Sequence, residues 1–165
     1  MPSYLITLTT YGHHIPGQPG TVNRHHNHFG SRLPHPNPRL RQSIDRRLLQ
    51  APFELDPADR QIVLEAITAV CEHKKWHLSA VHIRTNHVQI VTDGAASPEF
   101  MMNAFKSYAS RALNAKYPAH SSRLRWARHG STRHLFTREA LENAIKYTLD
   151  AQGERMAIYE HLTAP

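Results

Sequence analysis

Residues 76–92 contain two short runs of strand-forming residues with only a brief turn between them. The runs cover residues 76–83 and 87–92, and the turn is at residues 84–86. β-Branched and aromatic residues on both sides of so short a connection predict an antiparallel hairpin. The chain is therefore expected to adopt a fold that contains an antiparallel sheet.

Helical signals and further strand signals surround this hairpin. Residues 4–11 read as an opening strand, which we expect to be central. Asp56 precedes a first-turn proline and predicts a helix to about residue 75, and its apolar residues recur at three- and four-residue spacing. Ser97 predicts a second helix in the same way, ending near Tyr117. Both helices therefore present one apolar stripe to a core.

The end of the chain adds one strand and one helix. Residues 133–136 are a short strand-like run, and Thr137 is placed to cap a last helix that runs to Gly153. The element order predicts an α+β fold: a ferredoxin-like (RRM-like) antiparallel sheet with helices on one face, plus a C-terminal helix. We expect one domain over residues 1–165.

Residues 12–52 differ from the rest of the chain. They are rich in glycine, proline, histidine and arginine, and they predict a long irregular insertion that ends in a short helix. Its histidines could suggest zinc, but no partnered cysteines or zinc-finger spacing accompany them. Loop histidines without a metal are the preferred interpretation, and they are His13, His14, His25, His26 and His28.

Composition excludes several classes of protein. The chain has 165 residues, of which 40% are hydrophobic, and this is enough for one domain with a real core. No run is long enough to span a membrane, and the N-terminus does not resemble a signal peptide. Cys71 is the single cysteine, and packing explains it better than reactivity. We expect a cytoplasmic, nucleoid-associated protein.

The charge indicates a polyanionic partner. Lys and Arg number 20 against 13 Asp and Glu, which gives a formal net charge of +7. Basic residues are spread over loops and helices, and no basic amphipathic helix of the membrane-binding kind is evident. Nucleic acid is therefore favoured over a lipid surface.

The strongest local motif is His87-Val88-Gln89 in the second hairpin strand. Side chains alternate along a strand, so His87 and Gln89 share one face. An imidazole nitrogen and an amide oxygen at this spacing can bind one divalent cation, and Mg²⁺ or Mn²⁺ fits better than zinc because thiolates are absent. A strand with a solvated polar face is the alternative.

At this point the chain resembles a known family. Residues 76–91 resemble the strand pair of the single-tyrosine HUH transposases, a group that includes the REP-associated tyrosine transposases. There the second strand reads Asn-His-hydrophobic-His. The resemblance extends to the opening strand at Thr9-Thr10-Tyr11, to residues 105–114, and to Tyr147 on the last helix.

The resemblance implies an enzyme that cleaves and rejoins single-stranded DNA. Tyr147 would attack the scissile phosphate with the help of Mg²⁺ or Mn²⁺, leaving a 5′-phosphotyrosine link and a free 3′-hydroxyl. Its partners would be single-stranded or hairpin DNA and a second copy of the chain, with no nucleotide cofactor. Tyr108 is the rival tyrosine, although its position beside Phe105 and Ala112 suggests packing.

Two positions depart from the family pattern. Gln89 stands where the family has its second histidine, and Ala151 stands where the tyrosine helix commonly supplies a third metal ligand. Gln152 is the preferred substitute because Gly153 predicts that the helix unwinds there. Asp150 is the alternative, since it is charged and about 60° from Tyr147 on a regular helix.

The predicted DNA contacts are mainly arginines from the insertion and from the connection before the last strand. Trp126 joins them, and together with His129 and His134 it is available to stack on unpaired bases. The proposed set is Arg39, Arg41, Arg46, Arg47, Arg123, Arg125, Trp126, Arg128 and Arg133. Solvated arginines and a packed tryptophan are the alternatives.

Two other functions remain open. A catalytically weakened or domesticated binder of hairpin or single-stranded DNA would account for both departures in the predicted metal site. An RNA-binding sheet would share the fold, but the chain has no run that resembles the aromatic-rich strand motif of such domains.

Overall fold

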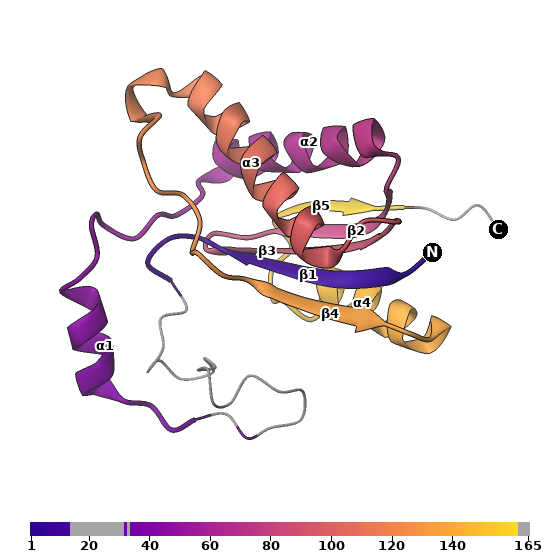
Figure 1. The fold of residues 1–165 in the computed structure, drawn as a ribbon, viewed down its shortest axis with the longest axis horizontal. Coiled ribbons are helices and arrows are strands. Elements are labelled where there is room, and N and C mark those ends of the chain that lie inside the picture. Colours follow the sequence, from indigo (N-terminus) through magenta and orange to yellow (C-terminus); the bar gives the residue numbers. More distant parts are fainter. Residues whose placement is uncertain (14–31, 33, 162–165) are drawn as a thin grey trace.

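A five-stranded antiparallel sheet forms the framework of the protein, with the strand order β4-β1-β3-β2-β5 (Figure 1). The computed structural model describes residues 1–13, 32 and 34–161. The predicted loop histidines His14, His25, His26 and His28 lie outside the described residues. The strands are β1 (Ser3–Thr9), β2 (His77–Ile83), β3 (His87–Asp93), β4 (Ser131–Leu135) and β5 (Ala157–Glu160).

The predicted hairpin is confirmed as β2 and β3, which are antiparallel neighbours. The predicted opening strand is β1, which lies between β3 and β4, away from both edges of the sheet. Strand β4 begins two residues before the predicted run and ends at Leu135. Strand β5 was not predicted, and it adds an edge beside β2.

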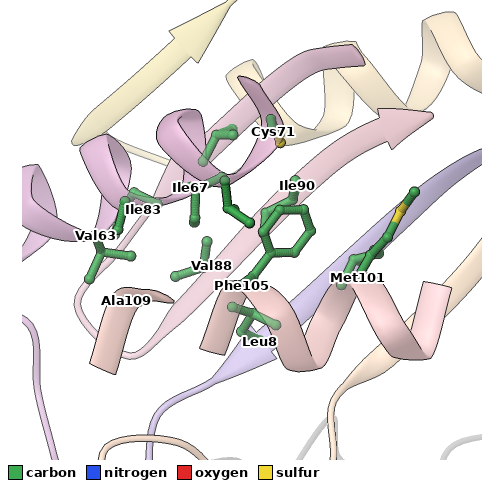
Figure 2. Packing of buried hydrophobic residues seen from close by; sticks show 14 of the residues in the cluster. Leu8, Val63, Ile67, Cys71, Ile83, Val88, Ile90, Met101, Phe105 and Ala109 are labelled. Carbon is green, nitrogen blue, oxygen red and sulfur yellow. The ribbon is translucent and has the colours of Figure 1, made fainter. Parts of the chain in front are cut away.

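Helices α2 (Pro57–Lys74) and α3 (Pro98–Lys116) cover one face of the sheet (Figure 1). Asp56 caps α2 through a capping box with Asp59, and the Ser97 side chain caps α3, as the sequence predicts. Figure 2 shows their apolar side chains packed against β1, β2 and β3. Cys71 is buried in this core, and burial raises the pKa of its thiol to about 12.

Helix α4 (Arg138–Asp150) lies on the opposite face of the sheet from α2 and α3 (Figure 1). A second, smaller core joins it to the strands. This core consists of Ala80, Val91, Leu135, Ala144 and Leu149. Thr137 caps the helix as predicted, but the helix ends at Asp150 instead of continuing to Gly153. A single helix on this face covers less of the sheet than the pair does on the other.

The described part of the insertion contains the short helix that the sequence predicts. This is α1 (Pro38–Asp45), and it has no buried residue. A 3₁₀ turn, η1 (Pro118–His120), follows α3 and leads into the basic connection before β4. In the described part of the chain, no helix has the length and apolar character needed to cross a membrane.

Candidate functional site

Strand β3 divides its side chains between the two faces of the sheet. Val88 and Ile90 belong to the core under α2 and α3. His87 and Gln89 therefore face α4, as alternation along a strand requires. Contacts with that side of the molecule agree: His87 reaches Gln152 beyond α4, and Gln89 lines a pocket with Tyr147. The predicted motif and the predicted nucleophile thus share one face.

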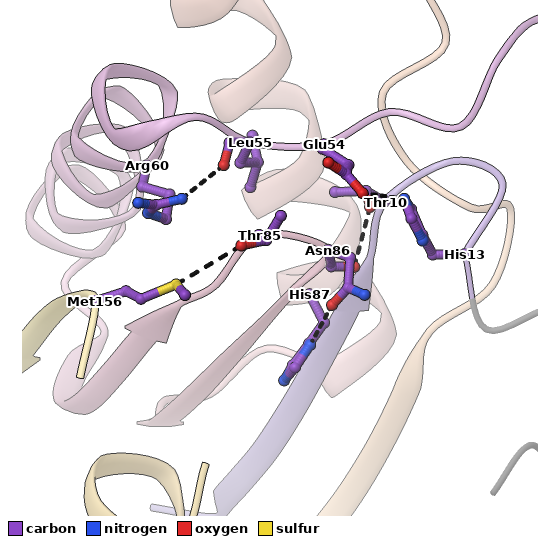
Figure 3. A network of polar contacts seen from close by, with 9 residues as sticks. All are labelled: Thr10, His13, Glu54, Leu55, Arg60, Thr85, Asn86, His87 and Met156. Atoms are coloured by element: carbon purple, nitrogen blue, oxygen red, sulfur yellow. Dashed lines mark hydrogen bonds and ion pairs between the residues drawn. The ribbon is translucent and has the colours of Figure 1, made fainter. Parts of the chain in front are cut away.

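The imidazole of His87 is held by its neighbour in the turn before β3. Its Nδ1 lies 2.8 Å from Asn86 Oδ1 (Figure 3). A neutral imidazole carries one N–H, and when Nδ1–H donates to Asn86 Oδ1 the lone pair is on Nε2. That Nε2 is 3.1 Å from Gln152 Oε1, another acceptor atom. In this tautomer the two atoms are both acceptors, and their separation suits a shared cation.

Gln89 adds a third candidate donor atom, an amide oxygen on the same strand as His87. The residue is 6% exposed, and its Oε1 is buried without a hydrogen-bond partner among the described residues. A buried amide oxygen without a partner is costly unless a ligand fills the role. Ligands at right angles on a Mg²⁺ ion stand about 3 Å apart, which matches the separation of His87 Nε2 and Gln152 Oε1. The donor set therefore fits a hard divalent cation.

Gln152 reaches this position because α4 ends early. Ala151 is the C-cap of the helix, and Gly153 has a φ of 82°, which favours glycine. Arg84 Nη1 donates to Glu154 O at 2.7 Å and fixes the following turn. The unwinding that the sequence predicts before Gly153 is thus present.

The alternative third ligand, Asp150, is engaged elsewhere. Its carboxylate accepts a hydrogen bond from the guanidinium of Arg155, which also forms an ion pair with it. The two side chains are each about half exposed. This pairing favours Gln152 over Asp150 as the ligand.

Tyr147 lies on the exposed side of α4, with 48% of its surface accessible. It lines a pocket of about 750 Å³ between α4 and the sheet. Gln89, Arg133 and Asn143 line the same pocket. A phenol here is accessible to a bulky substrate and shares its pocket with Gln89.

The rival tyrosine, Tyr108, belongs to the other side of the sheet. It is half-buried on α3, where the guanidinium of Arg111 stacks 4.4 Å from its ring centre. His73 of α2 also packs against the ring. Packing accounts for Tyr108, as the sequence suggests.

His82 is a residue beside the site that the sequence reasoning missed. It is fully buried on β2, and its Nδ1 donates to Thr148 O at 2.9 Å while its Nε2 accepts from the backbone N–H of Met156 at 3.1 Å. Burial lowers the pKa of His82, so the neutral ring that these two bonds require is favoured. His82 thus joins the end of α4 to the segment after Gln152. The sequence signal that could have identified His82 is its position within residues 76–91, which resemble the strand pair of the transposase family.

The predicted DNA contacts separate into two groups. Seven of the predicted arginines are exposed: Arg39, Arg41, Arg46, Arg47, Arg123, Arg128 and Arg133. Arg133 also lines the pocket that contains Tyr147. These residues remain predicted DNA contacts.

Arg125 and Trp126 are less accessible than the other predicted DNA contacts. Arg125 is 5% exposed; its guanidinium donates to Asn114 Oδ1 and lies 5.3 Å from the ring centre of Phe53. This burial contradicts a role in contacting DNA. Trp126 is half-buried beside the main core and donates from Nε1 to Ser110 Oγ at 3.0 Å, which fits the packing alternative, and its contact with DNA stays a prediction.

The two histidines predicted to stack on bases differ. His134 packs edge-on against Tyr4 and face to face with Phe136, with 8° between the last two planes. His129 is exposed, and its carbonyl accepts from Lys106, which also donates to Ala127 O. Burial lowers the pKa of Lys106, and the carbonyls around Nζ hold the basic connection in place.

Comparison with solved structures supports the fold. The chain is similar to a REP-associated tyrosine transposase whose structure was solved bound to a REP hairpin, with a TM-score of 0.53 and 10% identity. The likeness covers 90% of this chain and 64% of that one, so the chain spans less than two thirds of the other protein. At this identity the likeness shows the fold alone.

Comparison of sequences supplies the family. No curated protein matches the chain significantly. The family model for IS200-like transposases matches residues 53–146, which is more than half of the chain and ends one residue before Tyr147. The match includes both hairpin strands, α3, and most of α4. The chain therefore belongs to the IS200-like transposase family.

Proposed function

We propose that the protein cleaves and rejoins single-stranded DNA through a covalent 5′-phosphotyrosine link at Tyr147. The single observation that carries the proposal is that His87, which meets Gln152, and Gln89, which lines an open pocket with Tyr147, lie on the same face of β3. Membership of a transposase family supports the reaction type. The similar transposase was solved with a hairpin, and this supports DNA as the substrate.

The reaction is a transesterification at phosphorus. The phenol of Tyr147 gives up its proton, a bond forms between its Oη and the phosphorus, and the bond from phosphorus to the 3′-oxygen breaks. The departing 3′-oxygen takes a proton and becomes a free hydroxyl. The reverse attack by a 3′-hydroxyl rejoins the strand and releases Tyr147, so no external energy source is required.

His87, Gln89 and Gln152 would hold Mg²⁺ or Mn²⁺. A divalent cation at this position would supply positive charge to the scissile phosphate. Arg133 lines the pocket that contains Tyr147, and its guanidinium can hold a phosphate oxygen there. Asn143 lines the pocket one helical turn before Tyr147 and can orient the strand by hydrogen bonds.

A covalent adduct tests the proposal. The protein is incubated with a labelled single-stranded oligonucleotide and Mn²⁺, and the products are separated under denaturing conditions. We expect a labelled protein band that is absent in Tyr147→Phe and unchanged in Tyr108→Phe. Tyr108→Phe is the matched control, because it also removes a tyrosine hydroxyl but on the opposite face of the sheet.

The two departures in the ligand set favour a second candidate, a binder of hairpin or single-stranded DNA without cleavage. The same assay separates the two. Retained binding with no adduct under either metal would establish the binder and overturn the enzyme.

A homodimer is part of the proposal. Strand β4 is an edge of the sheet, and Phe136 just beyond it is 88% exposed. An open edge with an exposed aromatic ring is suited to pairing with a second copy. Light scattering should give twice the monomer mass, and Phe136→Asp should lower it.

A further inference from the structure

The turn between β2 and β3 is held by neighbouring segments as well as by its own hairpin. Arg84 N donates to His87 O at 2.9 Å and closes the hairpin. Leu55 N, in the segment before α2, donates to Thr85 O at 2.8 Å. The Thr85 hydroxyl donates to Met156 Sδ at 3.8 Å and ties the turn to the residue before β5 (Figure 3). The turn is therefore fixed by contacts from two other parts of the chain.

The last residue of this turn, Asn86, is held by Thr10, just beyond the end of β1. The backbone N–H and the hydroxyl of Thr10 both donate to Asn86 O, each at 3.0 Å (Figure 3). Thr10 is fully buried, and it forms a β-bridge with Trp126 on its other side. A carbonyl oxygen has two lone pairs, and Thr10 supplies a donor for each. The backbone of Asn86 is thus fixed by a residue that is itself fixed.

With its backbone fixed, the side chain of Asn86 acts on the ring of His87. Asn86 Oδ1 lies 2.8 Å from His87 Nδ1, and Gln152 Oε1 lies 3.1 Å from His87 Nε2. Each ring nitrogen therefore faces an amide oxygen. A neutral imidazole has only one N–H to donate, so the two oxygens compete for a single proton.

The two positions of this proton leave the site in opposite states. A proton on Nδ1 bonds to Asn86, and the lone pair of Nε2 then faces Gln152 Oε1, so that a cation between these two atoms can bind both. A proton on Nε2 donates to Gln152 Oε1 instead, and this hydrogen bond takes the place of the cation. The hydrogen bond made by one ring nitrogen thus decides whether the other can bind a metal.

The contact on the Asn86 side is the shorter and the better fixed of the two. Its length is 2.8 Å against 3.1 Å. Asn86 is the chain neighbour of His87, and its carbonyl accepts both bonds from Thr10. Gln152 lies after the end of α4, between the exposed residues 151 and 153. This difference favours the tautomer with the proton on Nδ1.

We infer that Asn86 is a positioning residue that keeps the proton of His87 on Nδ1 and the lone pair on Nε2, where a divalent cation can bind, and that Thr10 holds Asn86 in place for this task. The inference rests on the proposed function, because it concerns the proposed metal ligand His87. It adds that the ligand set depends on the turn before β3 and, through Thr10, on the end of β1.

The test determines the position of the proton directly in the metal-free protein. Proton–nitrogen correlation spectra of protein with isotope-labelled histidine distinguish a ring nitrogen that carries a proton from one that carries a lone pair. The spectra are recorded at alkaline pH, where an imidazole is neutral. Comparison with His87→Gln identifies the signals of His87. We expect the proton of the wild-type ring to be mainly on Nδ1.

Two substitutions of Asn86 should have opposite effects. Asn86→Leu removes the acceptor at similar size, so the proton should move to Nε2, and Mn²⁺ affinity measured by isothermal titration without DNA should fall about tenfold or more. Asn86→Asp keeps an acceptor and gives it a charge, so the proton should stay on Nδ1 and Mn²⁺ affinity should be equal or higher. A purely structural role of Asn86 would not move the proton between the two nitrogens.

Variants of Thr10 test the second part of the inference. Thr10→Val removes the hydroxyl donor but keeps the backbone N–H, so it should shift the proton towards Nε2 by less than Asn86→Leu does. Thr10→Ser keeps the hydroxyl and should restore the wild-type spectrum. The matched control is Asn103→Leu, which removes an exposed carboxamide from α3 on the opposite face of the sheet and should change neither readout.

Several outcomes would overturn the inference. These are a wild-type ring with its proton on Nε2, an Asn86→Leu ring that keeps its proton on Nδ1, and a loss of Mn²⁺ affinity in Asn86→Asp as large as in Asn86→Leu. Wild-type protein that does not bind Mn²⁺ would overturn it as well. None of these measurements involves DNA cleavage. The adduct assay at Tyr147 can therefore fail while the proton follows Asn86, and it can succeed while the proton does not.

Discussion

The Nε2 atom of His87 lies 3.1 Å from Oε1 of Gln152, although 65 positions separate the two residues in the sequence. The first is on a strand inside the sheet, and the second follows the helix that carries Tyr147. The end of α4 thus brings an amide oxygen to the imidazole and, about one turn earlier, a phenol to the same side of the sheet. Four predictions follow from this geometry and its surroundings.

Gln89→Leu should separate activity from stability. The buried Oε1 has no partner in the described protein, so its removal should leave the free energy of unfolding in metal-free buffer unchanged or raise it by up to about 1 kcal/mol. Adduct formation should fall by at least about tenfold because a ligand is lost. Denaturant unfolding and the adduct assay measure the two effects. Full activity in Gln89→Leu would contradict the assignment of this oxygen.

Gln152→Ala should weaken Mn²⁺ binding by about tenfold or more, as measured by isothermal titration. Asp150→Asn is the matched control, since the Asp150 carboxylate is already paired with Arg155. We expect that control to bind Mn²⁺ with unchanged affinity. The reverse ranking of the two variants would make Asp150 the ligand.

His82 should make stability depend on pH. Burial lowers its pKa in the folded protein, and Arg84 and Arg155 add repulsion, so the unfolded chain binds more protons. The contribution is complete above the unfolded pKa of about 6.5 and is lost as the pH falls through the folded value. His82→Leu should lose this pH dependence and cost about 2–4 kcal/mol at pH 8 by leaving Thr148 O and Met156 N–H unpaired.

The control for His82 is His120→Gln, which removes an exposed imidazole. The comparison is made by urea unfolding of the three proteins between pH 5 and pH 8, in steps of about half a pH unit. A parallel pH dependence in wild type and His82→Leu would show that another group titrates.

Gly130→Ala should destabilise the protein at the start of β4. A Cβ atom there would stand 2.4 Å from Thr7 O and 2.5 Å from Met102 Sδ, and the backbone oxygen cannot move aside cheaply. We expect a cost of about 1–3 kcal/mol, measured by thermal denaturation. Gly153→Ala is a useful comparison. A Cβ atom at position 153 would have only the Arg84 side chain near it, at 3.7 Å, so only the φ of 82° opposes this substitution. Equal stability of Gly130→Ala and wild type would show that β1 and β4 can separate there.

The sequence predicted best those elements whose signals are local. The capping box at Asp56 and the hydroxyl cap at Ser97 fixed the starts of α2 and α3, because each depends on residues three positions apart. The placement of Gln152 was also predictable, since Gly153 adopts the positive φ that ends a helix. The roles of His87, Gln89 and Gln152 as ligands stay predictions.

The elements that escaped prediction depend on distant partners. Strand β5 has four residues, Ala157–Glu160, too few to show a period, and it forms because β2 offers an open edge. Arg125 reads as a solvated charge, but Asn114 and a backbone carbonyl satisfy its guanidinium inside the fold. No residue spacing in the sequence predicts the pairing of β5 with β2 or the contacts that satisfy Arg125.

The edge position of β5 bears on how the proposed site can open. β5 pairs with β2 along one side only, whereas His87 and Gln89 belong to a strand with neighbours on both sides. Gln152 lies in the stretch that leads from α4 to β5, so local detachment of that edge would carry one ligand away and leave two in place. Occupancy by a cation would oppose such fraying and slow amide hydrogen exchange across residues 151–160. Pairing of the edge strand β5 with β2 would then be coupled to cation binding at the proposed site.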